Sequence, residues 1–284
     1  MRLATLTVIC AVVAACGSPA GLPATSTVGE TRETAATTTS QPLVVGCPDE
    51  GRFAEGGVVD QVDNPDSDTT TIGLISWQAD EACETFEIAF ETSEGAPATT
   101  PPSIRAEYVD DVGVIRLWMS ARETVISDQL VETTLVNRMY VVRSIDGGMF
   151  IDFHLDAPSQ ARIVAESSPA RLTLQLQPGI VDYTSAPTAS GPVVLITPAD
   201  DDTVPTTVTV EGYARTFESN VLILATQGDA VVIEENTTAA DSVDTWGQFR
   251  ASMDLVEGPI ALFVGNENAE TGRFEGVSID LEAR

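Results

Sequence analysis

From residue 43 onward, apolar and polar residues alternate along short segments of the chain. A period of two is typical of β-strands that bury one face. It predicts strands over residues 84–90, 112–119, 137–143, 149–156 and 171–176. Glycine, proline, aspartate and serine separate these segments, and the spacing of an amphipathic helix is not found in this part of the sequence. Short strands bounded by turn residues favour a β-sandwich or barrel.

The segment 149–156 alternates most regularly, and the prediction places Met149, Ile151, Phe153 and Leu155 in the core. Asp152, His154 and Asp156 then point outward. We expect His154 to be a solvated histidine, and the two flanking carboxylates should raise its pKa. A histidine–aspartate pair could instead orient a catalytic base, but no G-x-S-x-G turn or similar nucleophile context accompanies it.

A run rich in Pro, Ser and Thr interrupts the alternation and predicts a linker at residues 181–192. Beyond it, about seven short apolar segments follow within residues 193–284. That number and spacing fit an immunoglobulin-like sandwich. The predicted fold class is therefore all-β, with two β-sandwich-like domains at residues 43–180 and 193–284, the C-terminal one immunoglobulin-like.

The first 15 residues have one arginine followed by an apolar run too short to span a bilayer, as in a secretory signal peptide. The run ends in Val13-Ala14-Ala15-Cys16-Gly17, which resembles the lipobox of bacterial lipoproteins. This resemblance implies cleavage before Cys16 and lipidation of its thiol. A soluble secreted protein is the alternative. Residues 16–42 are rich in Ser, Thr, Ala and Pro, and predict a flexible tether after the lipid anchor.

The chain has four cysteines. Cys10 lies in the predicted signal peptide and Cys16 at the predicted lipidation site, which leaves Cys47 and Cys83. In an oxidising compartment an even pair favours a disulfide. Two separate buried thiols are the alternative, because sequence spacing alone does not decide between them.

Residues 193–284 resemble the immunoglobulin-like domain of bacterial spore germination. The resemblance is carried by a G-x-A-x-x-F-E motif and a later W-G-x-F motif, formed by Gly212, Ala214, Phe217, Glu218, Trp246, Gly247 and Phe249. We expect structural roles for these residues: Gly212 at a tight strand exit, Phe217 and Trp246 as apolar plugs in the core, and Glu218 bonded to a backbone group. The family implies an accessory module without catalytic residues.

The first domain more weakly resembles an actinobacterial AMIN-like domain. The matching pieces are residues 85–90, 102–108 and 146–150, and the segment Ser168 to Leu176. The last piece resembles the S-P-x-R-L-x-x-D ending of that family, although Gln175 or Gln177 stands near the place of its aspartate. The resemblance implies an all-β domain associated with the envelope or with peptidoglycan.

The composition disfavours one class of partner and excludes two kinds of lysine chemistry. The net charge is -29, which disfavours nucleic acid as a partner. All 14 basic residues are arginine, so Schiff-base chemistry and a phosphate-loop lysine are excluded for this sequence. His154 is the one histidine. The three tryptophans, Trp77, Trp118 and Trp246, lie at or beside apolar strand positions and are expected in the core, with a carbohydrate-stacking platform as the alternative.

Two acidic loops could hold calcium, one at Asp200-Asp201-Asp202 and one containing Asp60, Asp63, Asp66 and Asp68. Neither has the spacing of an EF-hand loop, so solvated loops are expected and no metal site or cofactor is predicted. Glycoside hydrolysis needs a pair of carboxylates. The chain has 43 acidic residues, and no sequence context identifies any of them as a buried carboxylate, so no catalytic pair is assigned.

The sequence predicts a lipid-anchored, extracytoplasmic, non-enzymatic accessory or binding protein of the cell envelope. Its expected partners are the membrane, through the anchor at Cys16, and peptidoglycan or another envelope protein. The two alternatives are a solute- or calcium-binding module for a transporter or sensor, and a carboxylate-dependent extracytoplasmic hydrolase.

Overall fold

The computed structural model describes residues 47, 51–109, 111–268 and 271–284. These residues form β-strands joined by turns, with one short 3-10 helix, η1 (Phe217–Ser219). The prediction of an all-β protein is confirmed. Internal contacts group the described residues into one compact unit. The predicted signal peptide, Cys16 and the tether lie outside the described residues.

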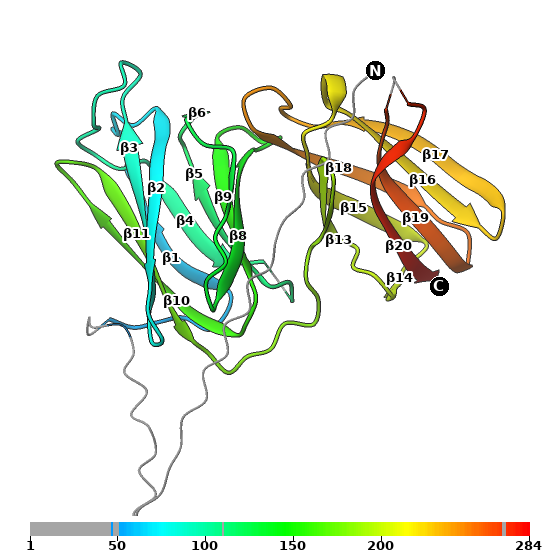
Figure 1. The fold of residues 1–284 in the computed structure, drawn as a ribbon, viewed down its shortest axis with the longest axis horizontal. Coiled ribbons are helices and arrows are strands. Elements are labelled where there is room, and N and C mark those ends of the chain that lie inside the picture. The colour runs from blue at the N-terminus through cyan, green and yellow to red at the C-terminus, as the bar shows by residue number, and fades with distance from the viewer. Residues whose placement is uncertain (1–46, 48–50, 110, 269–270) are drawn as a thin grey trace, which may run out of the picture. The chain divides into compact units, whose positions relative to one another are not determined.

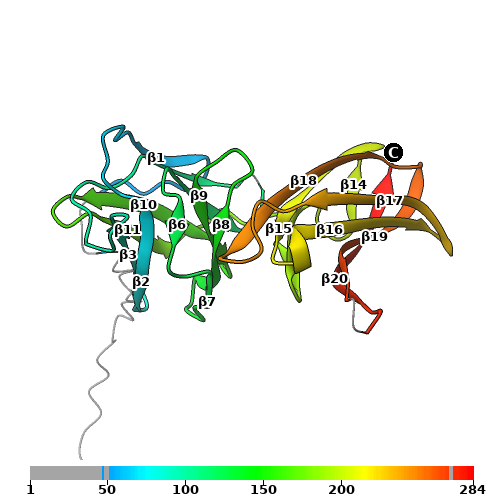
Figure 2. The same ribbon diagram turned by 90° about the horizontal axis from the view of Figure 1, so that it is seen from above.

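The first half of the compact unit contains eleven strands. They are β1 (Val58–Val62), β2 (Thr71–Ala79), β3 (Glu84–Glu91), β4 (Ile104–Tyr108), β5 (Val114–Met119), β6 (Glu123–Thr124), β7 (Asp128–Leu130), β8 (Val136–Arg143), β9 (Met149–Leu155), β10 (Ser159–Glu166) and β11 (Arg171–Pro178). One sheet has the order β10-β11-β3-β2-β6, and a second sheet begins β1-β4-β5-β9-β8 (Figures 1 and 2).

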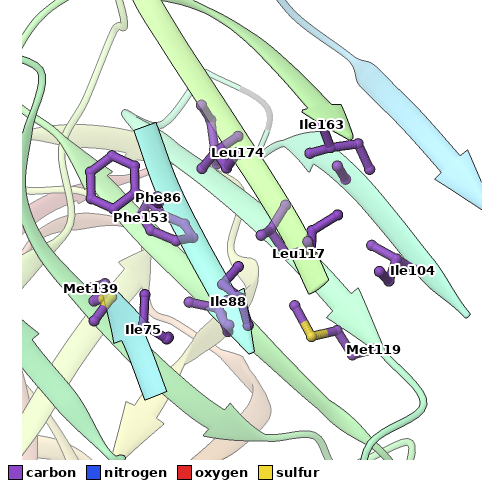
Figure 3. Packing of buried hydrophobic residues seen from close by; sticks show 14 of the residues in the cluster. Ile75, Phe86, Ile88, Ile104, Leu117, Met119, Met139, Phe153, Ile163 and Leu174 are labelled. Carbon is purple, nitrogen blue, oxygen red and sulfur yellow. The ribbon is translucent and has the colours of Figure 1, made fainter. Parts of the chain in front are cut away.

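The two sheets of this half share a hydrophobic core, part of which is drawn in Figure 3. Phe86, Ile88 and Leu174 come from the first sheet, and Leu117 and Phe153 from the second. The rings of Phe86 and Phe153 meet edge to face, with 5.0 Å between their centres. Side chains at every second position of a strand lie on the same face of the sheet. The apolar positions of the alternating sequence are therefore the ones that pack into this core.

The second half contains the remaining strands. They are β12 (Thr188–Ser190), β13 (Val193–Thr197), β14 (Asp202–Val204), β15 (Thr207–Ala214), β16 (Asn220–Gln227), β17 (Ala230–Thr238), β18 (Trp246–Asp254), β19 (Gly258–Glu267) and β20 (Phe274–Ala283). One sheet has the order β14-β20-β19-β16-β17. It packs against β13, β15 and β18 through a second core that contains Val210, Ile223, Phe249, Val264 and Ile279.

The two halves share a sheet. The order β1-β4-β5-β9-β8 continues through β18-β15-β13-β12, because β8 and β18 pair in parallel. The pairing is short: Trp246 lies opposite Val142, and Gly247 opposite Arg143. The Thr245 hydroxyl also donates to the carbonyl of Val141. A ladder of strands therefore runs from the first core to the second.

Two expectations about elements need qualification. The alternation did not predict β1, β2, β4, β6, β7, β10 and β14. Residues 181–192, predicted as a linker, contain β12, which pairs with β13. In the same segment the Tyr183 hydroxyl accepts a hydrogen bond from the Ser159 amide at 3.1 Å, so this segment is attached to the first half.

Candidate functional site

An ion pair lies buried where the two halves meet. Arg116 on β5 faces Asp152 on β9, its partner in the strand register. The Arg116 Nε and Nη2 atoms each donate to a carboxylate oxygen of Asp152 at 2.7 Å. The two side chains are 7% and 0% exposed. Burial acts to lower the pKa of Arg116, but the Asp152 carboxylate outweighs it and keeps that pKa above its ordinary value.

Asp152 corrects the sequence-based prediction. The alternation placed it outward, in solvent, yet all seven residues of β9 are buried. The outer face of β9 is covered because the second half packs against it, and Tyr213 of β15 reaches His154 there. No pattern within residues 149–156 signals this, since a strand covered by a neighbouring domain keeps polar residues that pair with one another.

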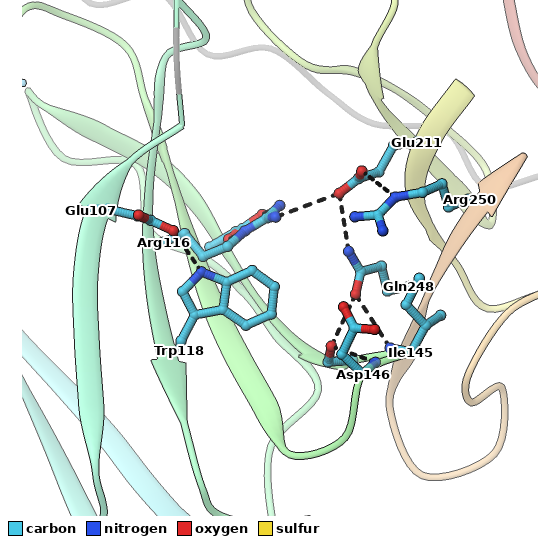
Figure 4. A network of polar contacts seen from close by, with 10 residues as sticks. Glu107, Arg116, Trp118, Ile145, Asp146, Glu211, Gln248 and Arg250 are labelled. Carbon is cyan, nitrogen blue, oxygen red and sulfur yellow. Dashed lines mark hydrogen bonds and ion pairs between the residues drawn. The ribbon is translucent and has the colours of Figure 1, made fainter. Parts of the chain in front are cut away.

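The polar contacts continue into the second half through Glu211 on β15 (Figure 4). One carboxylate oxygen of Glu211 lies 3.7 Å from Nη1 of Arg116 and accepts a hydrogen bond from Gln248 at 3.0 Å. The other accepts from Nε of Arg250 at 2.9 Å. The Gln248 carbonyl accepts from the Ser144 hydroxyl of the first half at 3.1 Å. Charged and amide groups of both halves thus form one network.

Aromatic rings fill the space beside this network. Tyr140 and Phe150 of the first half pack with Tyr213 and Trp246 of the second, in a third buried cluster. The centre of the Tyr140 ring lies 5.1 Å from the centre of the Tyr213 ring and 5.1 Å from that of the Trp246 ring. The Arg116 guanidinium lies over the Phe150 ring at 4.2 Å, a cation–π geometry. We call these residues, with the polar network, the junction.

His154 belongs to the junction, and the expectation of a solvated, raised-pKa histidine is wrong. Its side chain is buried, and Nε2 is hydrogen-bonded to the Tyr213 hydroxyl. Burial lowers the pKa of His154 to about 3, and the positive charges of Arg116 and Arg138 add to the effect. The ring is therefore neutral at physiological pH, with the Tyr140 ring packed beside it.

The tryptophans are divided between the core and the junction. Trp246 is buried in the junction and Trp118 packs half-buried at its edge, with Nε1 donating to Glu107 at 2.8 Å. Trp77 is half-buried against the first core. All three therefore pack against apolar clusters, and Trp118 and Trp77 keep part of their surface in solvent.

The buried carboxylates of the described residues are used by their neighbours. Asp152 accepts both bonds of Arg116. Glu84, only 1% exposed, accepts from the Leu135 amide at 2.7 Å and from the Thr133 hydroxyl at 2.6 Å. Each is held by donors from its own half, and both stabilise the packing around them.

The acidic loops bond to backbone amides. Asp68 accepts from the amides of Thr99 and Thr100, and these bonds lower its pKa. Asp200 accepts from the amide of Asp280 at 2.8 Å, and Asp202 from that of Ala199 at 2.8 Å. Within the part of the chain that the structure describes, no three His, Cys, Asp or Glu side chains are grouped so that they could hold a metal ion.

The motif residues of the second half have several different roles. Phe249 and Ala214 are buried in the second core, and Trp246 is buried in the junction. Gly212 and Gly247 are places where the backbone of another segment approaches closely: a Cβ atom on Gly212 would lie 2.1 Å from the Val194 carbonyl oxygen. Gly212 lies inside β15, so its role is close packing and not a strand exit.

Phe217 and Glu218 differ from expectation. Phe217 was predicted as a core plug, but 76% of it is exposed. It begins η1, a turn in which Glu218 and Ser219 have left-handed φ angles of 55° and 59°. Glu218 is exposed as well. The turn directs the ring away from the core, and no signal in the sequence distinguishes it from a buried phenylalanine.

Cys47 and Cys83 are joined by a disulfide, with 4.8 Å between their Cα atoms. The bridge ties the start of the described chain to the loop before β3. No helix in the described residues is long and apolar enough to cross a bilayer.

Comparison with known proteins identifies one domain. Residues 192–273 match the model of the immunoglobulin-like domain of bacterial spore germination, as the G-x-A-x-x-F-E and W-G-x-F motifs predicted. The match covers the part of the second core that lies before β20, and the junction residues of β15 and β18. No curated protein and no solved structure gives a significant match to the chain.

Proposed function

We propose that the protein is a lipid-anchored, extracytoplasmic accessory protein of the cell envelope that binds and does not catalyse. The anchor is a lipid on Cys16, and the tether of residues 16–42 carries the folded unit away from the membrane. The partner is peptidoglycan or another envelope protein, and the AMIN-like resemblance of the first domain supports the former.

The junction supports this proposal most directly. A hydrolase that uses two carboxylates needs them on either side of an open substrate site, about 5–10 Å apart. In the junction, Asp152 and Glu211 both contact the Arg116 guanidinium, which lies between them and is itself buried. These groups hold two domains together, which is a role expected of a binding scaffold.

The charge of the chain disfavours one class of partner. A net charge of -29 repels nucleic acid and acidic wall polymers, and favours neutral or positive ligands. The high charge also keeps a tethered protein soluble near other envelope components.

Metabolic labelling with radioactive palmitate in the native host tests the anchor. The wild-type chain should take up label and sediment with membranes. Cys16→Ser should lose the label and leave the membrane fraction, while the matched variant Cys10→Ser, altered inside the predicted signal peptide, should behave like wild type. An unlabelled wild-type product would refute the lipid anchor.

A further inference from the structure

The strand β17 lies at the edge of its sheet, beside β16 (Figure 1). It pairs with β16 from Asn220 opposite Thr238 to Gln227 opposite Ala230. Among the described residues, no strand pairs with its other edge. About every second amide and carbonyl of such an edge points away from the sheet, where another strand can pair with it.

The other sheet edges of the described chain are shorter or covered. The strands β6, β7, β12 and β14 have two or three residues each, and β1 has five with a shift in its register. β10 has eight, but Ala54 and Ala161 exchange backbone hydrogen bonds at 2.8 Å, so the segment before β1 covers part of it. With nine residues, β17 is therefore the longest free edge in the part of the chain that the structure describes.

Apolar side chains are exposed along this edge. Val231 is 57% exposed and Val232 is 37% exposed, and Ile233 packs half-buried against the second core. The register with β16 shifts beside Val232 and is regular from Ile233 to Thr238, which leaves a regular stretch for pairing. Free edges are commonly protected by lysine or proline, but the chain has no lysine and β17 has no proline. A further strand would cover the apolar side chains.

Two glutamates within the regular stretch define the charge of this edge. Successive side chains of a strand point to opposite faces, so Glu235 lies on the same face as Ile233 and Glu234 lies on the outer face. Within the described residues, neither carboxylate has a hydrogen-bond or ion-pair partner. Opposite charges on neighbouring strands attract and like charges repel, so an added strand is favoured by basic side chains beside these glutamates.

The same charges disfavour a second copy of the chain as the added strand. Antiparallel pairing of two β17 strands about their centres would bring Glu234 and Glu235 of one copy beside the glutamates of the other. Each copy also has a net charge of -29. Charge complementarity therefore favours a different, basic segment over self-association.

We infer that the free edge of β17 is a docking site for an extended segment of a partner protein. The segment adds to the sheet as a further strand and carries basic side chains beside Glu234 and Glu235. Backbone hydrogen bonds supply affinity in such strand addition, and side chains supply specificity. In taking the partner to be an envelope protein the inference rests on the proposed function, whereas the free edge and its charge are independent of the lipid anchor.

Titration calorimetry of the full-length chain with a capped peptide of alternating lysine and valine tests the inference. Salt at about 0.15 M screens attraction between distant charges. The peptide should bind wild type. Methylating two adjacent central backbone nitrogens keeps its charge but removes donors from both of its edges, and should weaken binding by about tenfold or more. The corresponding peptide of glutamate and valine should not bind.

A charge reversal on β17 tests the role of the glutamates. Glu234→Lys/Glu235→Lys should weaken binding of the basic peptide by about tenfold or more and should bind the acidic peptide. The matched control Glu81→Lys/Glu94→Lys makes the same change in net charge at exposed positions outside the strands, and should bind as wild type does. Melting temperatures without peptide show whether both variants are folded.

Amide hydrogen exchange of wild type locates the contact. With the basic peptide present, the free amides of β17 should exchange more slowly, while those of β1, another sheet edge, should be unchanged. The inference is overturned if wild type gives no binding heat with millimolar peptide, or if the methylated peptide binds equally well. Slower exchange elsewhere and not in β17 would also overturn it, as would self-association of the wild-type chain that protects β17.

The outcomes also separate this inference from the proposed function. Binding of the basic peptide without palmitate uptake would leave the docking site standing and remove the lipid anchor. Palmitate uptake by a chain that does not bind the peptide would leave the anchor standing and remove the docking site.

Discussion

Arg116 and Asp152 lie within the most buried part of the junction, so each depends on the other for its charge to be tolerated. Removing one partner leaves the other unpaired in a low-dielectric environment. Asp152→Ala should therefore lower the free energy of unfolding by about 3–5 kcal/mol in urea melts. Replacing both residues by apolar ones, in Arg116→Met/Asp152→Leu, should recover most of that loss.

A surface pair serves as the control. Arg105 bonds Glu107 at 2.6 Å, but the arginine side chain is 52% exposed. Arg105→Met should change stability by no more than about 1 kcal/mol. A loss as small as this in Asp152→Ala would contradict the role assigned to the buried pair.

His154 makes stability depend on pH. Its pKa is about 3 in the folded protein, against about 6.5 in an unfolded chain, so between these values the unfolded state binds more protons. The contribution of His154 is therefore complete above about pH 6.5 and is lost as pH falls toward 3, by at most about 1.4 kcal/mol per pH unit.

Urea melts at pH 7.0 and pH 4.5 measure this contribution. The difference in unfolding free energy between the two should be smaller in His154→Gln than in wild type. Tyr140, Tyr213, Arg116 and Arg138 surround the ring and are unchanged in the variant. Equal pH dependence in both chains would show that His154 is not buried as described.

The residues of β9 also show how much of the burial could be predicted from the sequence. Met149, Ile151 and Phe153 were predicted in the core and lie there. Asp152 and His154 were predicted in solvent and are buried. Periodicity shows which residues share a face of a strand, but whether a second domain covers the polar face depends on residues about 60 positions away, such as Tyr213.

At the scale of elements, the disulfide fixes the start of the folded chain. Cys47 and Cys83 are separated by 36 residues, and closing a loop of this length restricts the unfolded state. Cys47→Ser/Cys83→Ser should cost about 4 kcal/mol of stability by the chain-entropy relation. Guanidinium melts of wild type with and without dithiothreitol provide the matched measurement, and no change on reduction would contradict the bridge.

Gly247 allows β18 to lie close to the backbone of Ala240 and Asp241, in the loop between β17 and β18. A Cβ atom there would lie 2.1 Å from the amide nitrogen of Asp241, which is backbone and has little freedom to move. Gly247→Ala should lower the unfolding free energy by about 1–3 kcal/mol. Gly56→Ala, where a Cβ atom meets nothing within 4 Å, is the control and should be nearly neutral. Similar melts for the two variants would contradict the tight approach.

Strand-level prediction succeeded where alternation was strong. Residues 84–90 and 171–176 lie in β3 and β11. β2 was not predicted, and its register shifts between Ile72 and Ile75, which breaks the simple alternation. Phe217 is predicted in the core from its apolar side chain but is exposed in the structure. A 3-10 turn with two left-handed residues turns this side chain outward.

At the scale of the molecule, the junction determines whether the two domains unfold together. The sheet that continues through β8 and β18, the Arg116–Glu211 contact and the aromatic cluster join the two cores within residues 51–284. The immunoglobulin-like domain was predictable from its motifs, and residues 192–273 match that family. The joining of the domains was not predictable, because it pairs Val142 with Trp246, two residues about 100 positions apart.

Differential scanning calorimetry of the full-length chain tests this central claim most directly. If the junction joins the domains, both cores should melt in one transition whose calorimetric and van't Hoff enthalpies agree. Asp152→Ala should shift that single transition to lower temperature. Two separate transitions in wild type, with only the first-domain transition moved by Asp152→Ala, would contradict the account.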